Sequence, residues 1–169
     1  MNRNDTPGRL PVMAPRTEQA AVRRLVPMTV AQLDRILVVE TTAYEFPWTR
    51  GNFIDSLHAG YLARVLLGER DALLGYFVAM PGPAEMHLLN ITVAPAHQGQ
   101  GHAWYMLDAL VDAARAEGAL QLWLEVRQGN RRARDVYERY GFENVGVRRR
   151  YYPAAGGTRE DAIVMSLAL

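Results

Sequence analysis

Residues 97–110 read HQGQGHAWYMLDAL, and they place two glycines and an alanine where a helix is expected to begin. Glycine inside a helix costs about 1 kcal/mol relative to alanine, so helix stability alone does not explain Gly99 and Gly101. Small residues at a helix start leave backbone N–H groups accessible, and the helix dipole adds partial positive charge there. The stretch is therefore typical of a phosphate-binding loop, with a plain strand-to-helix loop as the alternative.

The two commonest glycine-rich phosphate loops do not match this stretch. The Gly-x-Gly-x-x-Gly pattern of dinucleotide-binding proteins is not met, and no Gly-Lys-Ser or Gly-Lys-Thr of a Walker loop occurs. A phosphate bound here would therefore belong to another class of ligand.

The composition is that of an ordinary globular protein. The chain has 169 residues, 49% of them hydrophobic and 22% charged, and this length fits a single domain. It has no cysteine, which excludes disulfides, thiolate metal sites and cysteine nucleophiles. The net charge of +1 argues against strong nucleic-acid binding, and no apolar run is long enough to span a membrane. We expect a flexible tail over 1–20, one folded domain over 21–169, and a cytoplasmic location.

Hydrophobic periodicity and turn signals predict alternating strands and helices. The expected strands are 21–28, 61–69, 72–80, 86–95, 119–127, 143–152 and 160–168. The expected helices run from Thr29 to about Thr42, from Thr49 to His58, from the glycine loop to Gly118, and from Asn130 to Tyr140. An antiparallel meander followed by a strand–helix–strand–helix unit predicts an α/β fold with a mixed, largely antiparallel central sheet flanked by helices.

Two of these elements carry expectations about burial. The strand 119–127 is almost continuously apolar, which predicts that both of its faces are buried. One face of the helix after the glycine loop is also expected to be buried, because apolar residues recur there at helical spacing. Its members are Trp104, Leu107, Leu110, Val111 and Ala114.

Several segments together resemble one enzyme family. ITVAPAHQGQGHA (91–103) resembles the acetyl-CoA-binding segment of the GNAT family of N-acetyltransferases, whose pattern Gln/Arg-x-x-Gly-x-Gly/Ala is met at Gln98, Gly101 and Ala103. FPWT (46–49), LWLEVRQGNRRARDVYERYGFENVG (122–146) and RRRYYPAAGGTREDAIVMSL (148–167) are similar to the ribosomal-protein-alanine N-acetyltransferases of that family, the RimI group. The resemblance covers about residues 25–168 and implies a single-domain GNAT-like fold.

The resemblance implies that acetyl-CoA is the acetyl donor, that no metal takes part, and that the glycine loop cradles the pyrophosphate. The implied cofactor-binding residues are Ile91, Thr92, Val93, Gln98, Gly99, Gln100, Gly101, His102, Ala103, Trp104 and Asn130. In the family, the strand holding 91–93 separates from the next strand and pairs through its backbone with the pantetheine arm; ordinary strand pairing is the alternative. Asn130 can equally serve only as a helix N-cap.

Three positions in the loop depart from the family pattern. Gly99 stands where the family usually has arginine or lysine, His102 where it has an aliphatic residue, and Trp104 where it has a basic or small one. Two cationic contacts to phosphate are therefore expected to be missing, although the backbone N–H donors remain. We expect His102 to be a partly exposed residue without a function.

The resemblance implies two catalytic residues. Glu125 matches the family's general base. A carboxylate inside an apolar strand is costly unless it has a function or an ion-pair partner. The alternative is therefore an ion pair with an arginine such as Arg127. Tyr137 matches the general acid, with an ordinary helix-face aromatic as the alternative. A phenol of pKa near 10 can protonate a thiolate of comparable basicity in a roughly balanced transfer.

The acceptor implied is the N-terminal alanine of a ribosomal protein. An α-amine has a pKa near 8 against 10.4 for lysine, so it is partly neutral at physiological pH and favoured as acceptor. The loop 44–48 and the pair 151–152 are expected to wall the acceptor groove, and Glu45 and Asp161 are candidate partners for basic acceptor residues. The alternatives are another protein N-terminus, a lysine or a small amine. A non-enzymatic alternative is an RNA- or ribosome-binding module using arginines 131, 132, 134, 139 and 148–150.

Overall fold

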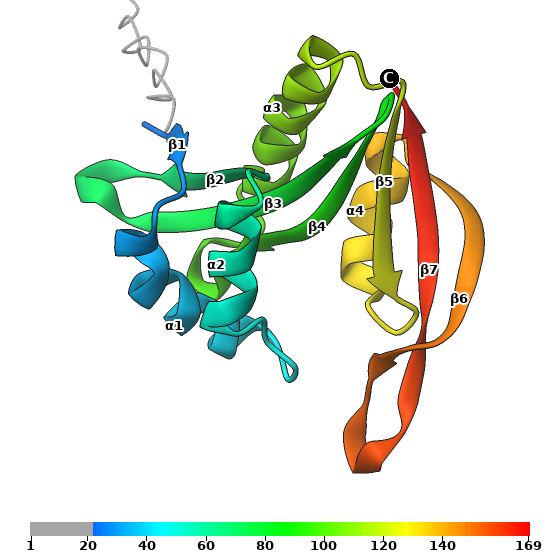
Figure 1. Ribbon diagram of the computed structural model, residues 1–169. Helices are drawn as coiled ribbons and strands as arrows, with labels where there is room; N and C mark the ends of the chain where they lie inside the picture. Colours follow the sequence, from blue (N-terminus) through cyan, green and yellow to red (C-terminus); the bar gives the residue numbers. More distant parts are fainter. Residues whose placement is uncertain (1–21) are drawn as a thin grey trace, which may run out of the picture.

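The computed structural model describes residues 22–169, so the expected tail over 1–20 lies outside the described residues. The strands are β1 (Arg24–Pro27), β2 (Leu62–Leu67), β3 (Leu73–Gly82), β4 (Glu85–Val93), β5 (Gln121–Arg127), β6 (Glu143–Pro153) and β7 (Arg159–Ala168). The helices of more than one turn are α1 (Leu33–Ala43), α2 (Arg50–His58), α3 (His102–Ala116) and α4 (Arg131–Tyr140). Figure 1 shows their arrangement along the chain.

The strands form one seven-stranded sheet in the order β1-β2-β3-β4-β5-β7-β6. Every neighbouring pair is antiparallel except β4 and β5, which run parallel because α3 connects them. This architecture confirms the expected α/β fold with a mixed, largely antiparallel sheet.

Helix boundaries follow the local signals in the sequence. Thr49 caps α2, because its hydroxyl accepts the Asn52 N–H while the Asn52 side chain accepts the Thr49 N–H. Asn130 caps α4 by accepting the Ala133 N–H at 3.1 Å. Gly141 ends α4 with a φ of 117°, a conformation that side chains disfavour. The expected caps and the glycine stop are therefore confirmed.

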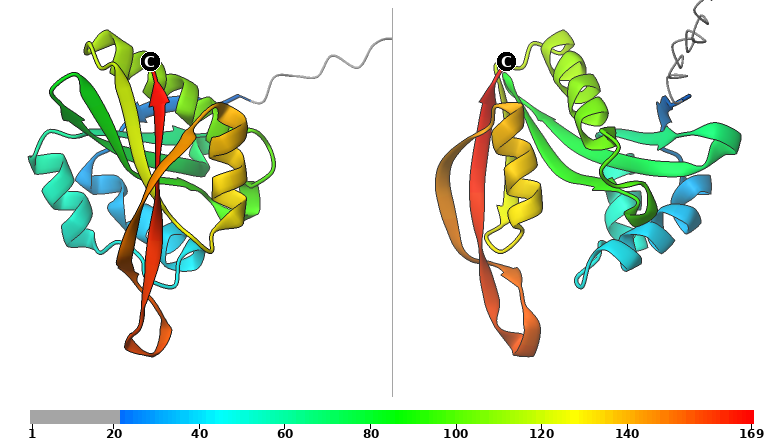
Figure 2. Two further views of the ribbon diagram at one scale, coloured as in Figure 1. Left: turned by 90° about the vertical axis from the view of Figure 1, so that its right-hand side faces the viewer. Right: turned by 180° about the vertical axis from the view of Figure 1, so that it is seen from behind.

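Two apolar clusters lie on opposite faces of the sheet. Side chains of α3 and α4 pack with Phe77 and Ala79 of β3, whereas those of α1 and α2 pack with the alternate residues Tyr76 and Val78. Figure 2 shows the two helix pairs on the two sides of the sheet. Among residues 22–169, no helix is long and apolar enough to cross a membrane.

Two expectations about burial are wrong. In β5 only one face is fully buried, because α1 and α2 cover the β1–β4 half of the sheet and leave Trp123, Glu125 and Arg127 partly exposed. In α3 the apolar face is buried from Met106 onward, but Trp104 is 43% exposed and packs edge-on against Tyr140. Both errors arise because a run of apolar residues does not show how much of its surface a neighbouring helix or strand covers.

The sheet opens between β4 and β5. Their pairing covers only residues 85–88 with 121–124, and a bulge at Leu89 turns the rest of β4 away. The two strands visibly diverge in Figure 1, and the β6–β7 hairpin projects beyond them. The expected separation of these strands is confirmed, and it creates the space in which the candidate site lies.

Candidate active site

Two cavities meet where β4 and β5 diverge. One, of about 500 Å³, lies between the end of β4, the glycine loop and α4, and we call it the cofactor cleft. The other, of about 340 Å³, lies between the α1–α2 loop, β5 and the β6–β7 hairpin, and we call it the acceptor cavity. The residues that line both are Tyr44, Ile91, Asn130, Ala133 and Tyr137. The junction can therefore hold a group passed from one cavity to the other.

The glycine loop has the geometry of an anion cradle. Gly99 and Gly101 have φ values of 75° and 77°, in the left-handed region that side chains disfavour, and a β-carbon at either would face open space. Gly101 is the N-cap of α3 and supplies no side-chain cap, so the first N–H groups of the helix are left for another acceptor. The loop thus fits the pyrophosphate of a nucleotide-containing cofactor.

Most of the expected cofactor-binding residues line the cofactor cleft. Those placed there are Ile91, Thr92, Val93, Gln98, Gly99, Gly101, His102, Ala103, Trp104 and Asn130. Gln100, which is exposed, does not line it. Arg132, two residues after the Asn130 cap, also lines the cleft but was not among the predicted cofactor-binding residues. It supplies a positive charge on the cleft, whereas Gly99 replaces the basic residue that is usual in the family.

His102 is buried rather than partly exposed, which corrects the expectation. Only 3% of the residue is exposed, since it begins α3 beneath the loop. Its pKa is lowered by burial, by Arg23 and by His97, so the imidazole is neutral at physiological pH. Arg23 approaches Nδ1 at 3.4 Å. His102 therefore adds no positive charge for a phosphate.

The free edge of β4 faces the cofactor cleft. Residues 90–93 pair with β3 on one side, while pairing with β5 has already ended at Leu88. A strand edge of this kind presents N–H and C=O groups that an amide-bearing arm can extend. Of the two alternatives open from the sequence, ordinary pairing of these residues with β5 does not occur.

Aromatic side chains wall the acceptor cavity. Phe46 and Trp48 come from the α1–α2 loop and Tyr152 from β6, whereas Tyr151 does not line the cavity. The Arg127 guanidinium lies over the rings of Phe46 at 5.3 Å and Tyr152 at 4.6 Å, so it joins the two walls. The cavity therefore offers aromatic walls, from the loop and from the hairpin, to a small apolar group.

Glu125 lies on β5 and lines the acceptor cavity with a side chain that is 10% exposed. Its Oε1 is 3.2 Å from Arg148 on β6, and its Oε2 is 3.8 Å from Nε2 of His87 on β4. The suggested partner Arg127 pairs instead with Glu160 at 3.1 Å, because it points toward the hairpin. Glu125 therefore does form an ion pair, as the alternative predicts, but with Arg148 and not with Arg127. Its carboxylate still lines the acceptor cavity.

Tyr137 lies at the junction of the two cavities. Its ring packs edge-on against Phe142, which holds it on the inner face of α4. Burial raises the pKa of Tyr137, with smaller contributions from Tyr44 and Tyr152. The phenol is therefore protonated throughout the physiological range and is a weaker acid than the ordinary value near 10 implied.

A buried polar network behind the acceptor cavity was not expected from the sequence. Glu40 on α1 is 1% exposed and accepts hydrogen bonds from Trp48, Tyr76 and Asn90. The only sequence signal was an acid at a core-facing position of a helix, four residues after Ile36. The network forms part of one wall of the cavity.

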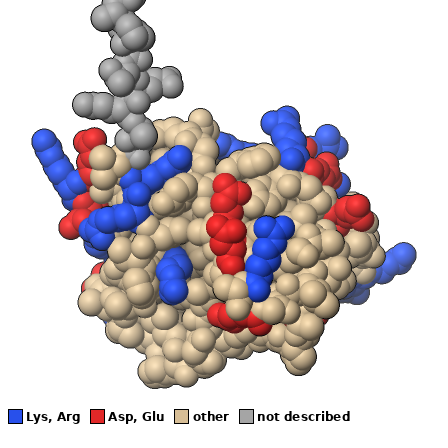
Figure 3. Space-filling view, turned by 90° about the horizontal axis from the view of Figure 1, so that it is seen from above, with Lys and Arg blue, Asp and Glu red and all other residues tan. Residues whose placement is uncertain are grey.

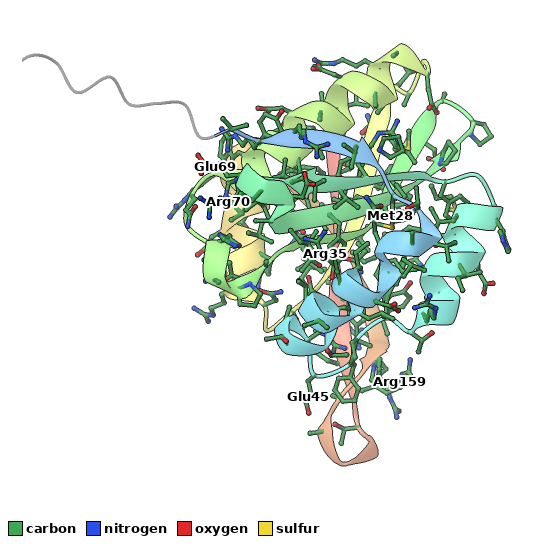
Figure 4. All side chains as sticks on the ribbon, turned by 90° about the vertical axis from the view of Figure 1, so that its left-hand side faces the viewer. Met28, Arg35, Glu45, Glu69, Arg70 and Arg159 are labelled. Atoms are coloured by element: carbon green, nitrogen blue, oxygen red, sulfur yellow. The ribbon has the colours of Figure 1, made fainter. Side chains whose placement is uncertain are left out.

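The charged candidates for acceptor recognition do not line the acceptor cavity. The carboxylate of Asp161 accepts the Arg150 N–H at 2.7 Å, and Glu45 is exposed on the α1–α2 loop. Figure 4 shows Glu45 and Arg159 at the end of the molecule where the hairpin projects. On the face seen in Figure 3, acidic side chains lie among the basic ones. Within residues 22–169, no group of three or more His, Cys, Asp or Glu residues is placed to hold a metal ion.

Comparisons with known proteins agree with this geometry. The model of the acetyltransferase (GNAT) family matches residues 33–142. The ribosomal protein bS18-alanine N-acetyltransferase of Haemophilus ducreyi is 36% identical over 143 residues, which cover 83% of this chain and 98% of that protein. The enzyme of the same name from Escherichia coli K12 is 36% identical over 131 residues, or 78% and 87% of the two chains. The crystal structure of the Escherichia coli ribosomal-protein-S18-alanine N-acetyltransferase has a TM-score of 0.79 at 33% identity, covering 87% of this chain and 94% of that one. The resemblance found in the sequence is confirmed, and the chain belongs to the GNAT family of acetyltransferases.

Proposed function

We propose that the protein transfers the acetyl group of acetyl-CoA to the N-terminal alanine amine of a ribosomal protein, with Glu125 as general base and Tyr137 as general acid. The observation that carries the proposal is the position of Tyr137 at the junction of a cleft with an anion-binding loop and a cavity that holds Glu125. The names of the relatives from Haemophilus ducreyi and Escherichia coli support the acceptor.

The cofactor supplies the acetyl thioester, and the residues of the chain position it and move protons. The loop N–H groups at Gly101 bind the pyrophosphate, with Arg132 as the cation, and the free edge of β4 holds the amide-bearing arm. Glu125 takes a proton from the acceptor ammonium, directly or through one water. The amine nitrogen then bonds to the thioester carbonyl carbon, and the C–S bond breaks as Tyr137 gives its proton to the departing sulfur. The second proton lost by the nitrogen returns to Tyr137 through solvent, and the proton held by Glu125 is the one released over the reaction.

The form of the acceptor cavity favours a chain end over a side chain of a folded domain. Phe46 and Tyr152 line the cavity with Arg127 over both rings, and the volume of about 340 Å³ leaves room for a small terminal residue. An α-amine is also easier to deprotonate than lysine by more than two pKa units. Together these features support an N-terminal alanine as the acceptor.

Acetyl transfer to two peptides tests this proposal. We expect acetyl-CoA turnover with an alanine-initiated peptide, and none with the same peptide blocked at its amino end but carrying internal lysines. Mass spectrometry of the product locates the acetyl group. Acetyl on a lysine while the amino end stays free contradicts the α-amine assignment.

A second test concerns the glycine loop. Gly101→Ala places a β-carbon in the space beside the helix N-terminus, and we expect the dissociation constant for acetyl-CoA to rise at least about tenfold, or 1.4 kcal/mol. Calorimetric titration measures this change. Gly118→Ala is the matched control, because Gly118 has a φ of 80°, also faces open space, and lies beyond the far end of α3. Equal affinities in the two variants would assign the loop a purely structural role.

A further inference from the structure

Glu40 is a fully buried carboxylate for which the chemistry proposed above has no use. It lies on the inner face of α1, beside the cavity wall, and is 1% exposed. Burying a charged group is expensive unless hydrogen bonds replace its water. Among residues 22–169, no arginine or histidine pairs with it. Its stability there must therefore come from neutral donors.

Three such donors converge on Glu40 from three different elements. The Trp48 backbone N–H of the α1–α2 loop donates to Oε1 at 2.9 Å. The Tyr76 hydroxyl of β3 donates to Oε2, and the Asn90 side-chain amide of β4 reaches both oxygens at 3.3 and 3.4 Å. The carboxylate thus ties the loop that walls the acceptor cavity to the two central strands.

The network continues through Asn90 and Thr92 to the junction of the two cavities. Because Asn90 donates its amide hydrogens to Glu40, its Oδ1 is left to accept the Thr92 hydroxyl at 2.9 Å. The Tyr44 hydroxyl lies 2.7 Å from the Thr92 oxygen and 3.2 Å from the Ile91 carbonyl oxygen, and it donates its proton to these acceptors. Tyr44 lines both cavities, and burial raises its pKa to about 12, so it keeps this proton.

We propose that Glu40 is a positioning residue, which holds the loop 44–48 and the Tyr44 hydroxyl in place and so sets the acceptor-side wall of the site. Its oxygens are occupied by donors, so it acts through the loop and not by contact with the acceptor. The inference rests on the proposed acetyl transfer for its kinetic consequence. Its structural consequence, the protection of the Trp48 amide, does not depend on that function.

Glu40→Gln tests the proposal with little change in volume. A glutamine offers one acceptor oxygen where three donors converge, so either the Trp48 N–H loses its partner or the Asn90 amide must turn over. We expect kcat/KM for the alanine-initiated peptide to fall at least about tenfold through KM, with the acetyl-CoA dissociation constant within about twofold of wild type. We also expect hydrogen–deuterium exchange at the Trp48 amide to accelerate at least about tenfold.

Asp34→Asn is the matched control, because Asp34 lies on the same helix with an 85% exposed side chain paired with Arg50. It is expected to leave all three quantities unchanged. Tyr76→Phe removes one of the three donors to Glu40 and keeps the others, so we expect a smaller rise of about threefold in the peptide KM. This variant tests the proposal even if Glu40→Gln does not fold.

Wild-type peptide kinetics and wild-type exchange at Trp48 in Glu40→Gln would overturn the proposal. An equal loss of acetyl-CoA affinity would overturn it as well, because it would show a general structural role. Faster exchange at Trp48 in a protein whose wild type acetylates no peptide would support the loop assignment and contradict the proposed function, so the two failures are distinguishable.

Discussion

Replacing Tyr137 with phenylalanine is expected to lower turnover about 10²–10⁴-fold, while folding and acetyl-CoA affinity persist. The variant loses only a hydroxyl, and its ring still packs against Phe142 on the inner face of α4. Without that hydroxyl the departing sulfur must leave unprotonated or take its proton from water. Steady-state kinetics and calorimetric titration separate the loss of turnover from any loss of binding.

Tyr140→Phe is the control for this prediction. Tyr140 lies three residues further along α4, lines neither cavity, and donates to Asp108 of α3 at 2.8 Å. Its substitution removes a tyrosine hydroxyl from the same helix and is expected to affect stability by about 1 kcal/mol without changing turnover. Wild-type turnover in Tyr137→Phe would mean that another group protonates the thiolate.

The pH dependence gives a second check on Tyr137. Because burial raises its pKa, the phenol remains protonated well above the ordinary value near 10. We therefore expect no loss of turnover from ionisation of Tyr137 as the pH rises to about 10. The sequence alone predicts an ordinary phenol and a balanced proton transfer, because it does not show that α4 places this ring at the buried junction of two cavities.

Local signals in the sequence were sufficient to predict the elements of the fold. Thr49 and Asn130 cap their helices through hydrogen bonds to residues three positions away. Gly141 ends α4 because its own backbone adopts a left-handed conformation. Such interactions do not depend on the rest of the chain. The separation of β4 from β5 came instead from the family resemblance and is confirmed.

The side-chain partners within the candidate site could not be predicted in the same way. Glu40 meets Asn90 across fifty positions of sequence, and Glu125 meets Arg148 across the strand β7 that lies between theirs. Each pairing depends on register and on which face of an element is uncovered. The sequence predicts Arg127 as the partner of Glu125, whereas the structure pairs Glu125 with Arg148. Proximity along one strand can be seen in a sequence, but proximity across a sheet cannot.

Glu125→Gln is expected to lower kcat/KM at neutral pH about 10²-fold, because glutamine keeps the size of the side chain but cannot accept a proton. For the wild type, kcat/KM should already be high at neutral pH, because Glu125 takes the proton of the acceptor amine. In the variant the rate should recover partly near pH ~8, where the α-amine loses its proton unaided. Glu85→Gln, at the paired end of β4 remote from the cavities, is the control and is expected to behave as wild type.

The contact between Glu125 and Arg148 allows base catalysis to be separated from an ion pair of purely structural importance. Arg148→Gln breaks the same contact, 3.2 Å in length, from its half-exposed partner and leaves the carboxylate free to accept a proton. If Glu125 is the base, Arg148→Gln should retain most of the turnover that Glu125→Gln loses. Equal losses in the two variants, with no recovery of Glu125→Gln at high pH, would show that the ion pair matters and that the proton of the acceptor amine leaves by another route.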